Sequence, residues 1–436
     1  MFKNKEFARY SVIFMFLGLF YMFFYSGLQN DHLNVITPFL QELGWSDLKI
    51  TNPVTVGATA GVIFYLIIGA AFVKFGVKKI LVPCIIITAV SCVGITMAEE
   101  SYMIYAVSLF LIRLLVIPLQ MGGFMLAANW FIKYRGRVMG VITAGSPMFS
   151  VFGIGLLTSL VGKFGLSAYN YLAGVLVLVA IVTAFGIKDT PEEAGLYPDG
   201  SEKPPKSDSG EGETEISVKK LLSEKRAWQL IISYGILQFV ILCMMAYMAV
   251  RYISLSGPDD IPNLFVSKAL LWLSVGAAAG IPMSYVIGWI DDKLGSIKAS
   301  LILNILFFFA VVPLAIMPVG GSVPLMIVWA FGVACMTGGV PTMHPCITSY
   351  VYGRRLYMAA NKWIMTIQAI PMAFGLAFMG YFNQAGNLDM AYYILIGLLV
   401  VSFVTILSMK DIKDANEADR EYGKALEEKL TVDSNA

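Results

Sequence analysis

Two short stretches of similar chemistry decide the fold: GAAFVKFGVKK at residues 69–79 and GWIDDKLGSIK at residues 288–298. Each begins with glycine, has a second glycine seven residues later and ends in lysine. The second stretch begins 219 residues after the first (288 − 69). YRGR at 134–137 and YGRR at 352–355 repeat at nearly the same spacing, 218 residues (352 − 134). Two matches at one spacing predict a duplicated unit that fills about half the chain.

The composition places this duplicated unit in a membrane. Of the 436 residues, 58% are hydrophobic and 14% are charged, whereas about a quarter of a soluble protein is charged. A helix needs roughly 20 apolar residues to cross a bilayer. The sequence has twelve such runs, at about 10–40, 53–73, 80–98, 102–131, 138–161, 169–187, 228–254, 264–290, 299–318, 323–350, 358–383 and 389–409. A soluble enzyme is therefore excluded.

Lipid offers no partners to backbone polar groups, so the twelve runs are expected to be helices. We predict an all-α, polytopic membrane protein with twelve transmembrane helices in two pseudo-symmetric six-helix bundles. The expected units are a first bundle (1–187), a cytoplasmic linker (188–227), a second bundle (228–409) and a cytoplasmic tail (410–436). Residues 200–215 have the composition of a disordered linker, residues 215–228 predict a short amphipathic helix, and the charged tail predicts a solvated helix.

Basic residues predict the orientation. Most of the 31 Lys and Arg fall in the N-terminal segment, the linker, the tail and the loops on their side, whereas the opposite loops hold only Lys49 and Lys163. By the positive-inside rule, both termini and the linker are cytoplasmic. A basic start followed by an apolar run without a small-residue cleavage site predicts a retained helix. We therefore expect a multi-pass protein of the cytoplasmic (inner) membrane.

Several other classes of function find no support. A net charge of +2 gives no nucleic-acid footprint. The five cysteines lie inside apolar runs without the spacing of a disulfide framework or a metal site. Neither a nucleophile–base motif nor a cofactor motif is present, so we expect no enzyme activity, no cofactor and no metal.

The repeated loops resemble those of the major facilitator superfamily, whose loop signature is Gly-x-x-x-Asp-Arg-x-Gly-Arg-Lys, and this resemblance covers essentially the whole chain. The second copy matches at Gly288, Asp292, Lys293 and Gly295, and the first at Gly69, Lys74, Gly76, Lys78 and Lys79. Val73 stands where the acid of the first copy belongs. The resemblance implies alternating-access transport, with these loops as conformational gates. The acid can cap or pair with a neighbouring helix end, a role that Val73 cannot fill in the N-terminal half.

Further segments resemble one branch of that family, the oxalate/formate antiporters and monocarboxylate transporters. They are Asn129-Trp130-Phe131 with Arg135-Gly136-Arg137, Gly140 and Ala144-Gly145, then Pro191-Glu192-Glu193 with Pro198-Asp199-Gly200, and Pro345 through Tyr352-Gly353 to Ala360-Asn361.

Charges inside the spans mark candidate functional residues, because an ionisable group in a membrane is costly. Such charges are Asp31, Arg113, Arg251, Lys268 and Lys362, joined by the two histidines, His32 and His344. The two lysines lie near helix ends and can snorkel. In the resembled fold, the first, fourth, seventh and tenth helices line the central path, and the other five residues fall on those helices. The repeat offset pairs Arg251 with His32 (251 − 219).

We predict that the solute is bound by Arg113, Arg251, His344, Gln368, Tyr25 and Asn30. Asp31 and His32 are predicted to act in proton coupling or gating. Blander interpretations stand beside these: Arg113 as a lock between helices, Asp31 as the neutraliser of Arg113 or Arg251, and the histidines and Tyr25 as packing residues.

Differences from the resembled branch bear on the substrate. Ser284 and Gln368 stand where those carriers have basic residues, and Asp31 or a neighbour replaces a lysine of the first helix. An oxalate-like dicarboxylate is therefore disfavoured. The prediction is a secondary transporter for a small organic solute, a monocarboxylate in the first place, working by proton symport or solute exchange as a monomer in the lipid bilayer. Alternatives are a carrier for a zwitterion, such as a betaine or amino acid, and a transporter-like membrane sensor.

Overall fold

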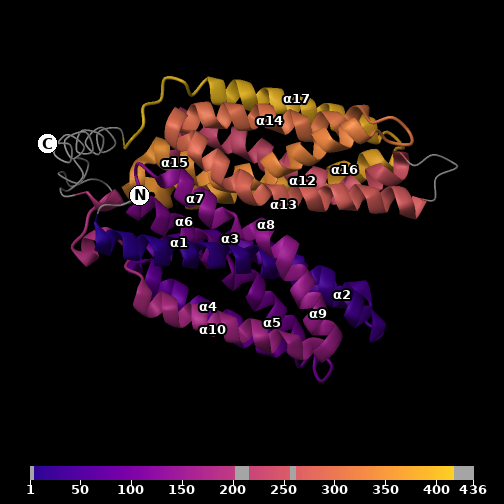
Figure 1. Ribbon diagram of the computed structural model, residues 1–436, viewed down its shortest axis with the longest axis horizontal. Helices are drawn as coiled ribbons and strands as arrows, with labels where there is room; N and C mark the ends of the chain where they lie inside the picture. Colours follow the sequence, from indigo (N-terminus) through magenta and orange to yellow (C-terminus); the bar gives the residue numbers. More distant parts are fainter. Residues whose placement is uncertain (1–3, 202–215, 256–261, 417–436) are drawn as a thin grey trace.

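A computed structural model describes residues 4–201, 216–255 and 262–416, which form helices and loops without any strand among them (Figure 1). The predicted linker disorder falls largely on 202–215, and the predicted tail helix largely on 417–436, both outside the described residues. The short helix expected within 215–228 is present as α11 (Val218–Ser223).

The first half of the chain contains ten α-helices with π-helical and 3-10 segments between them. They are α1 (Lys5–Ser26), η1 (Gly27–Asp31), α2 (Leu33–Glu42), α3 (Asp47–Phe75), α4 (Val77–Ile95), α5 (Tyr102–Leu115), α6 (Ile117–Trp130), α7 (Arg135–Thr143), α8 (Gly145–Met148), η2 (Phe149–Gly153), α9 (Ile154–Phe164), η3 (Gly165–Ala168) and α10 (Tyr169–Gly186). Short 3-10 turns η4 (Pro191–Ala194) and η5 (Pro198–Gly200) follow.

The second half has fewer and longer helices. They are α12 (Lys225–Leu255), α13 (Pro262–Leu294), α14 (Ser296–Ile316), α15 (Val323–Ala373), α16 (Gly375–Gln384) and α17 (Leu388–Leu407).

Ten stretches among the described residues are long and apolar enough to cross a membrane. Two of them hold two crossings each: residues 135–186 turn at Gly165, and residues 323–384 break at Gly353. Counted with these two interruptions, the described residues hold twelve candidate crossings, in agreement with the predicted all-α polytopic fold.

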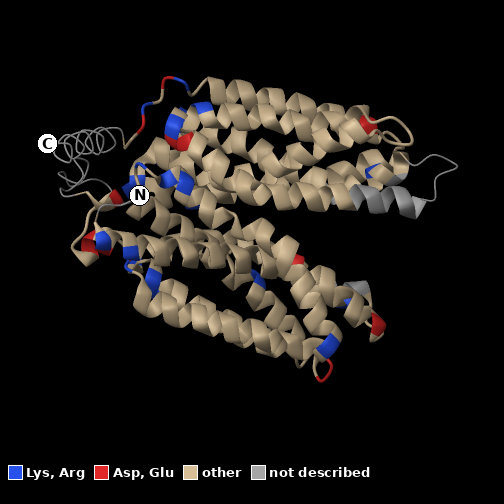
Figure 2. Ribbon diagram, viewed as in Figure 1, with Lys and Arg blue, Asp and Glu red and all other residues tan. Residues whose placement is uncertain are grey.

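The helices gather into two bundles, α1–α10 and α12–α17, that meet near the end where the N-terminus lies and diverge toward the end that carries α2 and α16 (Figure 1). We call these the closed end and the far end. Charged residues gather at the helix ends and leave most of the span uncharged (Figure 2). The predicted boundaries at 187/188, 227/228 and 409/410 stay a prediction.

The loop glycines support the duplication directly. Gly76 has φ 86° and Gly295 has φ 84°, a backbone region that favours glycine. Each glycine ends one helix and directly precedes the next, α3 to α4 and α13 to α14. The two copies of the quoted stretch therefore make the same turn.

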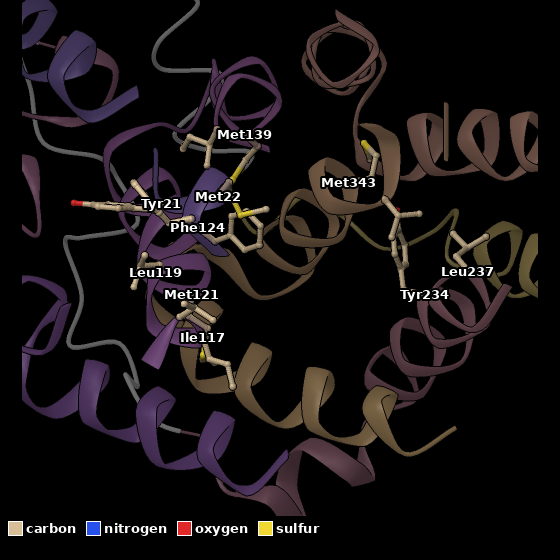
Figure 3. Packing of buried hydrophobic residues seen from close by; sticks show 14 of the residues in the cluster. Tyr21, Met22, Ile117, Leu119, Met121, Phe124, Met139, Tyr234, Leu237 and Met343 are labelled. Atoms are coloured by element: carbon tan, nitrogen blue, oxygen red, sulfur yellow. The ribbon is translucent and has the colours of Figure 1, made fainter. Parts of the chain in front are cut away.

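Each bundle has its own packed interior. Figure 3 shows Tyr21, Met22, Phe124 and Met139 together in the first bundle, and Tyr234, Leu237 and Met343 together in the second. All of these side chains are buried within the protein. Since lipid is as apolar as these side chains, close packing holds the helices together.

Gly353 offers a test of the break in α15. Its φ of 69° is unfavourable for any residue with a Cβ atom, so Gly353→Ala should lower the free energy of unfolding by about 1 kcal/mol. The melting temperature of the purified protein in detergent measures the change. The matched control is Gly397→Ala in α17, where an added Cβ meets open space. A Gly353→Ala protein as stable as Gly397→Ala contradicts the break.

Candidate functional site

Arg113 is the centre of a polar cluster inside the first bundle. It lies near the end of α5, and its side chain is 7% exposed. Gly57 of α3 makes room for it, because a Cβ atom there would lie 2.8 Å from the Arg113 Cβ. The long side chain can therefore lie flat against α3 and extend toward the first transmembrane helix.

The guanidinium of Arg113 reaches the π-helical segment η1. One terminal nitrogen donates to the backbone carbonyl of Gln29 and, at 2.8 Å, to Oδ1 of Asn30. Both acceptors are neutral, and the buried Nε–H has no hydrogen-bond partner among the described residues. The structure thus joins two predicted binding residues, Arg113 and Asn30, and no carboxylate of the described residues pairs with the cation.

A chain of neutral hydroxyl and amide groups lies close to Arg113. The Tyr25 hydroxyl of α1 is 3.4 Å from the Tyr65 hydroxyl of α3, which donates to Oε1 of Gln120 on α6 at 3.1 Å. Both phenols lie within electrostatic range of Arg113. The sequence indicated Tyr25 but missed Tyr65 and Gln120, since uncharged residues in a span look like packing residues.

The partners of Asp31 in the described part of the chain are hydroxyl groups. Its Oδ2 accepts from Ser150 at 2.7 Å and more weakly from Ser26 at 3.5 Å, and Ser146 donates to Ser26 at 2.9 Å. Ser150 lies on η2, so two π-helical segments face each other here. Among the described residues no arginine or lysine forms an ion pair with Asp31, and Arg113 and Arg251 have other partners.

His32, the neighbour of Asp31, is turned toward the sixth crossing. Its Nδ1 lies 2.7 Å from the hydroxyl of Tyr169 on α10, and the side chain is fully buried. This placement is that of a hydrogen-bonded packing residue, which is the alternative to a role in proton coupling or gating. Its predicted part in coupling or gating stays a prediction.

A second polar cluster lies inside the second bundle and brings together His344 and Gln368, both on α15. His344 Nε2 is 2.9 Å from Oε1 of Gln368, which also accepts from Gln238 of α12 at 3.2 Å. Gln368 Nε2 donates to the carbonyl of Leu230 at 3.0 Å. This donor fixes the amide orientation, so His344 Nε2 carries the hydrogen.

Arg251 does not join either cluster. Its guanidinium forms a 2.6 Å ion pair with Asp389 at the start of α17 and donates to the carbonyls of Leu314 and Ala315 at 3.0 and 3.5 Å. Sequence reasoning did not single out Asp389, the first residue of the last apolar run, and so missed this partner. The repeat offset makes Arg251 the mate of His32, and their partners lie on equivalent helices, Tyr169 on the sixth crossing and Asp389 on the twelfth.

The second loop copy acts across the closed end. Asp292 accepts the backbone N–H groups of Gly136 at 2.8 Å and Arg137 at 3.2 Å, and pairs with the Arg137 side chain at 3.1 Å. This caps the N-terminus of α7, as the resemblance implied for the acid. Gly136 and Gly288 touch so closely that a Cβ atom on either would overlap the carbonyl oxygen of the other.

Further contacts across the closed end surround this cap. Arg135 donates to the Ser349 hydroxyl at 2.9 Å, and the Thr143 and Thr342 hydroxyls are 2.6 Å apart. The Arg354 guanidinium donates to the carbonyl of Asn129 at 3.1 Å and pairs with Glu192 at 2.7 Å. These bonds all join the first half of the chain to the second half.

Of the other gate-loop residues, Gly69 also contacts the second bundle, whereas the two lysines lie over aromatic rings of their own helices. Gly69 packs against the stem of Lys362, where an added Cβ would lie 2.6 Å away. Lys74 and Lys293 lie over the rings of Phe75 and Trp289, at 5.3 and 4.1 Å. Gly76 and Gly295 make the turns described above. The side chain of Lys268 lies outside the described ones.

The linker segments that suggested the family branch dock onto the same end. Asp189 accepts the N–H of Lys78 at 2.8 Å, and Asp199 accepts those of Ile132 and Lys133 at 3.0 and 2.8 Å. Burial raises the pKa of Asp199, and the two backbone donors partly oppose that rise. The linker start is therefore part of the closed end.

Twelve crossings in two joined bundles, with charged groups held inside them, define a membrane transport protein. The chain belongs to the Major Facilitator Superfamily, whose profile matches residues 14–362. The members of this family are transporters that carry small solutes, some of them with protons, and not enzymes. A search of curated proteins gives no match.

Solved structures of the same fold include the transporter FucP in an outward conformation, with 16% identity, TM-score 0.64 and coverage of 91% of this chain and 99% of that one. A variant of the E. coli fucose:proton symporter FucP has 15% identity and TM-score 0.65 (91% and 98%). The proton:xylose symporter XylE, bound to 6-bromo-6-deoxy-D-glucose, has 11% identity and TM-score 0.71 (94% and 98%). At these identities the similarity concerns the fold alone.

Cys346 of α15 reports on the closed end, because it is fully buried three residues before Ser349. Asp292→Ala removes the cap of α7, and N-cap losses cost about 1 kcal/mol. We expect N-ethylmaleimide to label Cys346 about fivefold faster, as measured by peptide mass spectrometry. Cys92, buried in α4, should not change.

The matched control for that variant is Lys298→Ala, an exposed residue six positions farther along. Equal Cys346 labelling in the Asp292→Ala and Lys298→Ala proteins contradicts the role of Asp292 at the closed end.

Proposed function

We propose that this protein is a secondary active transporter that moves a small monocarboxylate across the cytoplasmic membrane by alternating access, with proton symport or solute exchange. The observation that carries the proposal is Arg113, a buried cation with neutral partners and an unused Nε–H. A guanidinium binds a carboxylate through paired hydrogen bonds. A carboxylate solute would supply the missing anion.

The substrate is bound, on this proposal, in the first bundle. Arg113 takes the carboxylate, and Asn30, Tyr25 and the neighbouring Tyr65 and Gln120 contact the rest of the solute. His344 and Gln368, the polar pair of the second bundle, are proposed to contact the solute as well. Arg251 is left out, because an acid and two carbonyls already satisfy its guanidinium.

Asp31 is the proposed proton carrier. A carboxylate with only hydroxyl partners has no fixed countercharge to hold it ionised, so a proton can neutralise it. The absence of an arginine partner among the described residues favours this role over a gating salt bridge.

The proposed orientation in the membrane rests on the basic residues, and the proposed conformation rests on the contacts between the bundles. We assign the closed end to the cytoplasm, with both termini and the 188–227 linker there, because most of the basic residues gather at it. The bonds between the bundles lie at that end, so this conformation is outward-facing. The oxalate/formate and monocarboxylate branch fits the linker and loop segments noted above, and we propose a monomer.

A zwitterion is the second candidate. Asp31 lies next to Asn30, the residue that binds Arg113, so an amino acid or betaine could place its carboxylate on Arg113 and its ammonium group near Asp31. A membrane sensor is a remote third candidate, which measured transport would exclude.

Ligand binding at Arg113 is tested by thermal shift, because a ligand of the folded state raises the melting temperature. Formate, acetate, lactate, oxalate, glycine and glycine betaine are the probes. We expect a monocarboxylate to raise the melting temperature and oxalate to leave it unchanged. In Arg113→Ala the affinity should fall at least about tenfold, since bonds to charged groups contribute about 1.5–3 kcal/mol.

Two variants sharpen that comparison. Arg113→Lys keeps the charge without the paired donors and should retain part of the affinity. Arg251→Gln should lower the melting temperature of the free protein yet keep the ligand shift. An undiminished shift in Arg113→Ala contradicts the proposed site, and a shift by glycine betaine alone favours the zwitterion.

Proton coupling is tested in proteoliposomes with the ligand that the thermal shift identifies. An inward proton gradient should drive accumulation by the wild type but not by Asp31→Asn, whereas exchange of internal for external solute should persist in both. Ser150→Ala, which removes one hydroxyl donor, serves as the control that retains the carboxyl group. Gradient-driven uptake by Asp31→Asn at the wild-type rate overturns the role of Asp31.

A further inference from the structure

The tail segment 410–416 completes the closed end where the first loop copy lacks its acid. The backbone N–H of Arg354 is the repeat mate of that of Gly136 (354 − 136 is 218). Gly136 has Asp292 as its acceptor, whereas the repeat mate of Asp292 is Val73 (292 − 219), which has no side-chain acceptor. The second half of α15 therefore needs another cap.

Asn416 supplies that cap. Its Oδ1 accepts the N–H of Arg354 at 3.2 Å, and its Nδ2 donates to the carbonyl of Ser349 at 3.0 Å. The two bonds lie on opposite sides of the break at Gly353, and Asn416 is only 3% exposed. Asparagine is among the best residues for capping a helix N-terminus.

The rest of the segment is bonded into place. Ala415 N–H donates to the carbonyl of Tyr350 at 2.8 Å, and the Tyr350 hydroxyl donates to the carbonyl of Ile412 at 3.2 Å. Oδ1 of Asp414 accepts from the backbone and side chain of Asn416 at 2.9 and 3.1 Å. Asp414 also lies within electrostatic range of Arg135 in the first bundle.

Asn416 thus holds two of the groups by which α15 reaches the first bundle. It fixes the backbone of Arg354, whose guanidinium bonds to Asn129 and Glu192. It also fixes Ser349, whose hydroxyl accepts from Arg135. The missing acid of the first copy is replaced by a tail residue that acts through an arginine.

We propose that Asn416 is a positioning residue for the transport cycle, which caps the second half of α15 and orients Arg354 so that the closed end stays shut. The tail is then part of the gate, and whatever detaches residues 410–416 favours opening of that end. This inference rests on the contacts of the closed end and does not depend on which solute is carried.

Labelling of Cys346 in the full-length protein tests the proposal. Asn416→Ala should speed the modification by N-ethylmaleimide about fivefold, the effect of a lost cap, and leave Cys92 unchanged. Lys413→Ala, an exposed position in the same segment, is the matched control and should label at the wild-type rate. An unchanged Cys346 rate in Asn416→Ala overturns the proposal. An equal rise at Cys92 also overturns it, since that result means general loosening.

A double variant tests the route through Arg354. If Asn416 acts by orienting Arg354, then Asn416→Ala combined with Arg354→Ala should label Cys346 within about twofold of the faster single variant. Independent contributions would instead multiply the two increases, and that result excludes a positioning role. The melting temperatures of all variants are measured alongside to confirm that each protein is folded.

Discussion

An ionised side chain inside a membrane is stable only with a polar or charged partner. The two buried arginines differ in the partners that they have. Arg251 has Asp389 and two carbonyls. Arg113 has only neutral acceptors and an Nε–H without a partner in the described part of the chain. Since an uncompensated buried charge is costly, Arg113 is the group best suited to an anionic ligand.

The closed end likewise depends on finding partners for buried polar groups, in this case the backbone N–H groups at helix N-termini. The first N–H groups of a helix lack partners within the helix. Asp292 satisfies those of α7 from the opposite bundle, whereas Asn416 satisfies that of Arg354 from the tail. The two halves of a duplicated fold thus solve one problem in two ways. The helix α15 carries His344 before the break at Gly353 and Gln368 after it. The same helix therefore contributes to the contacts of the closed end and to the polar cluster of the second bundle.

The sequence was sufficient to predict the membrane class, the twelve crossings and the duplicated loops, because long apolar runs and repeated glycines leave few alternatives. It also indicated Arg113, Asn30, His344 and Gln368, which the structure brings into contact in two pairs. The sequence did not predict which side chains would be bonded to one another. Asp389, at the edge of the last apolar run, was not singled out, and the repeat offset that linked Arg251 with His32 did not name the partner of either.

The sequence also did not single out the neutral polar residues or the tail residue that the structure shows to be involved. Tyr65, Gln120 and Ser150 are polar groups within apolar helices, and nothing in their spacing separates a ligand contact from packing. Asn416 stands in a charged tail without any periodicity, and only its position beside Arg354 in three dimensions gives it a role. Repeat arithmetic did show that an acid was missing at Val73, but not what replaced it.

The central claim is that Arg113 holds the carboxylate of a transported solute. Its most direct test is solute counterflow in proteoliposomes filled with an unlabelled monocarboxylate identified by thermal shift, with the same compound supplied outside in radioactive form. We predict transient accumulation of label with the wild type, and none with Arg113→Ala at equal protein content. Accumulation by Arg113→Ala equal to that of the wild type would contradict the account.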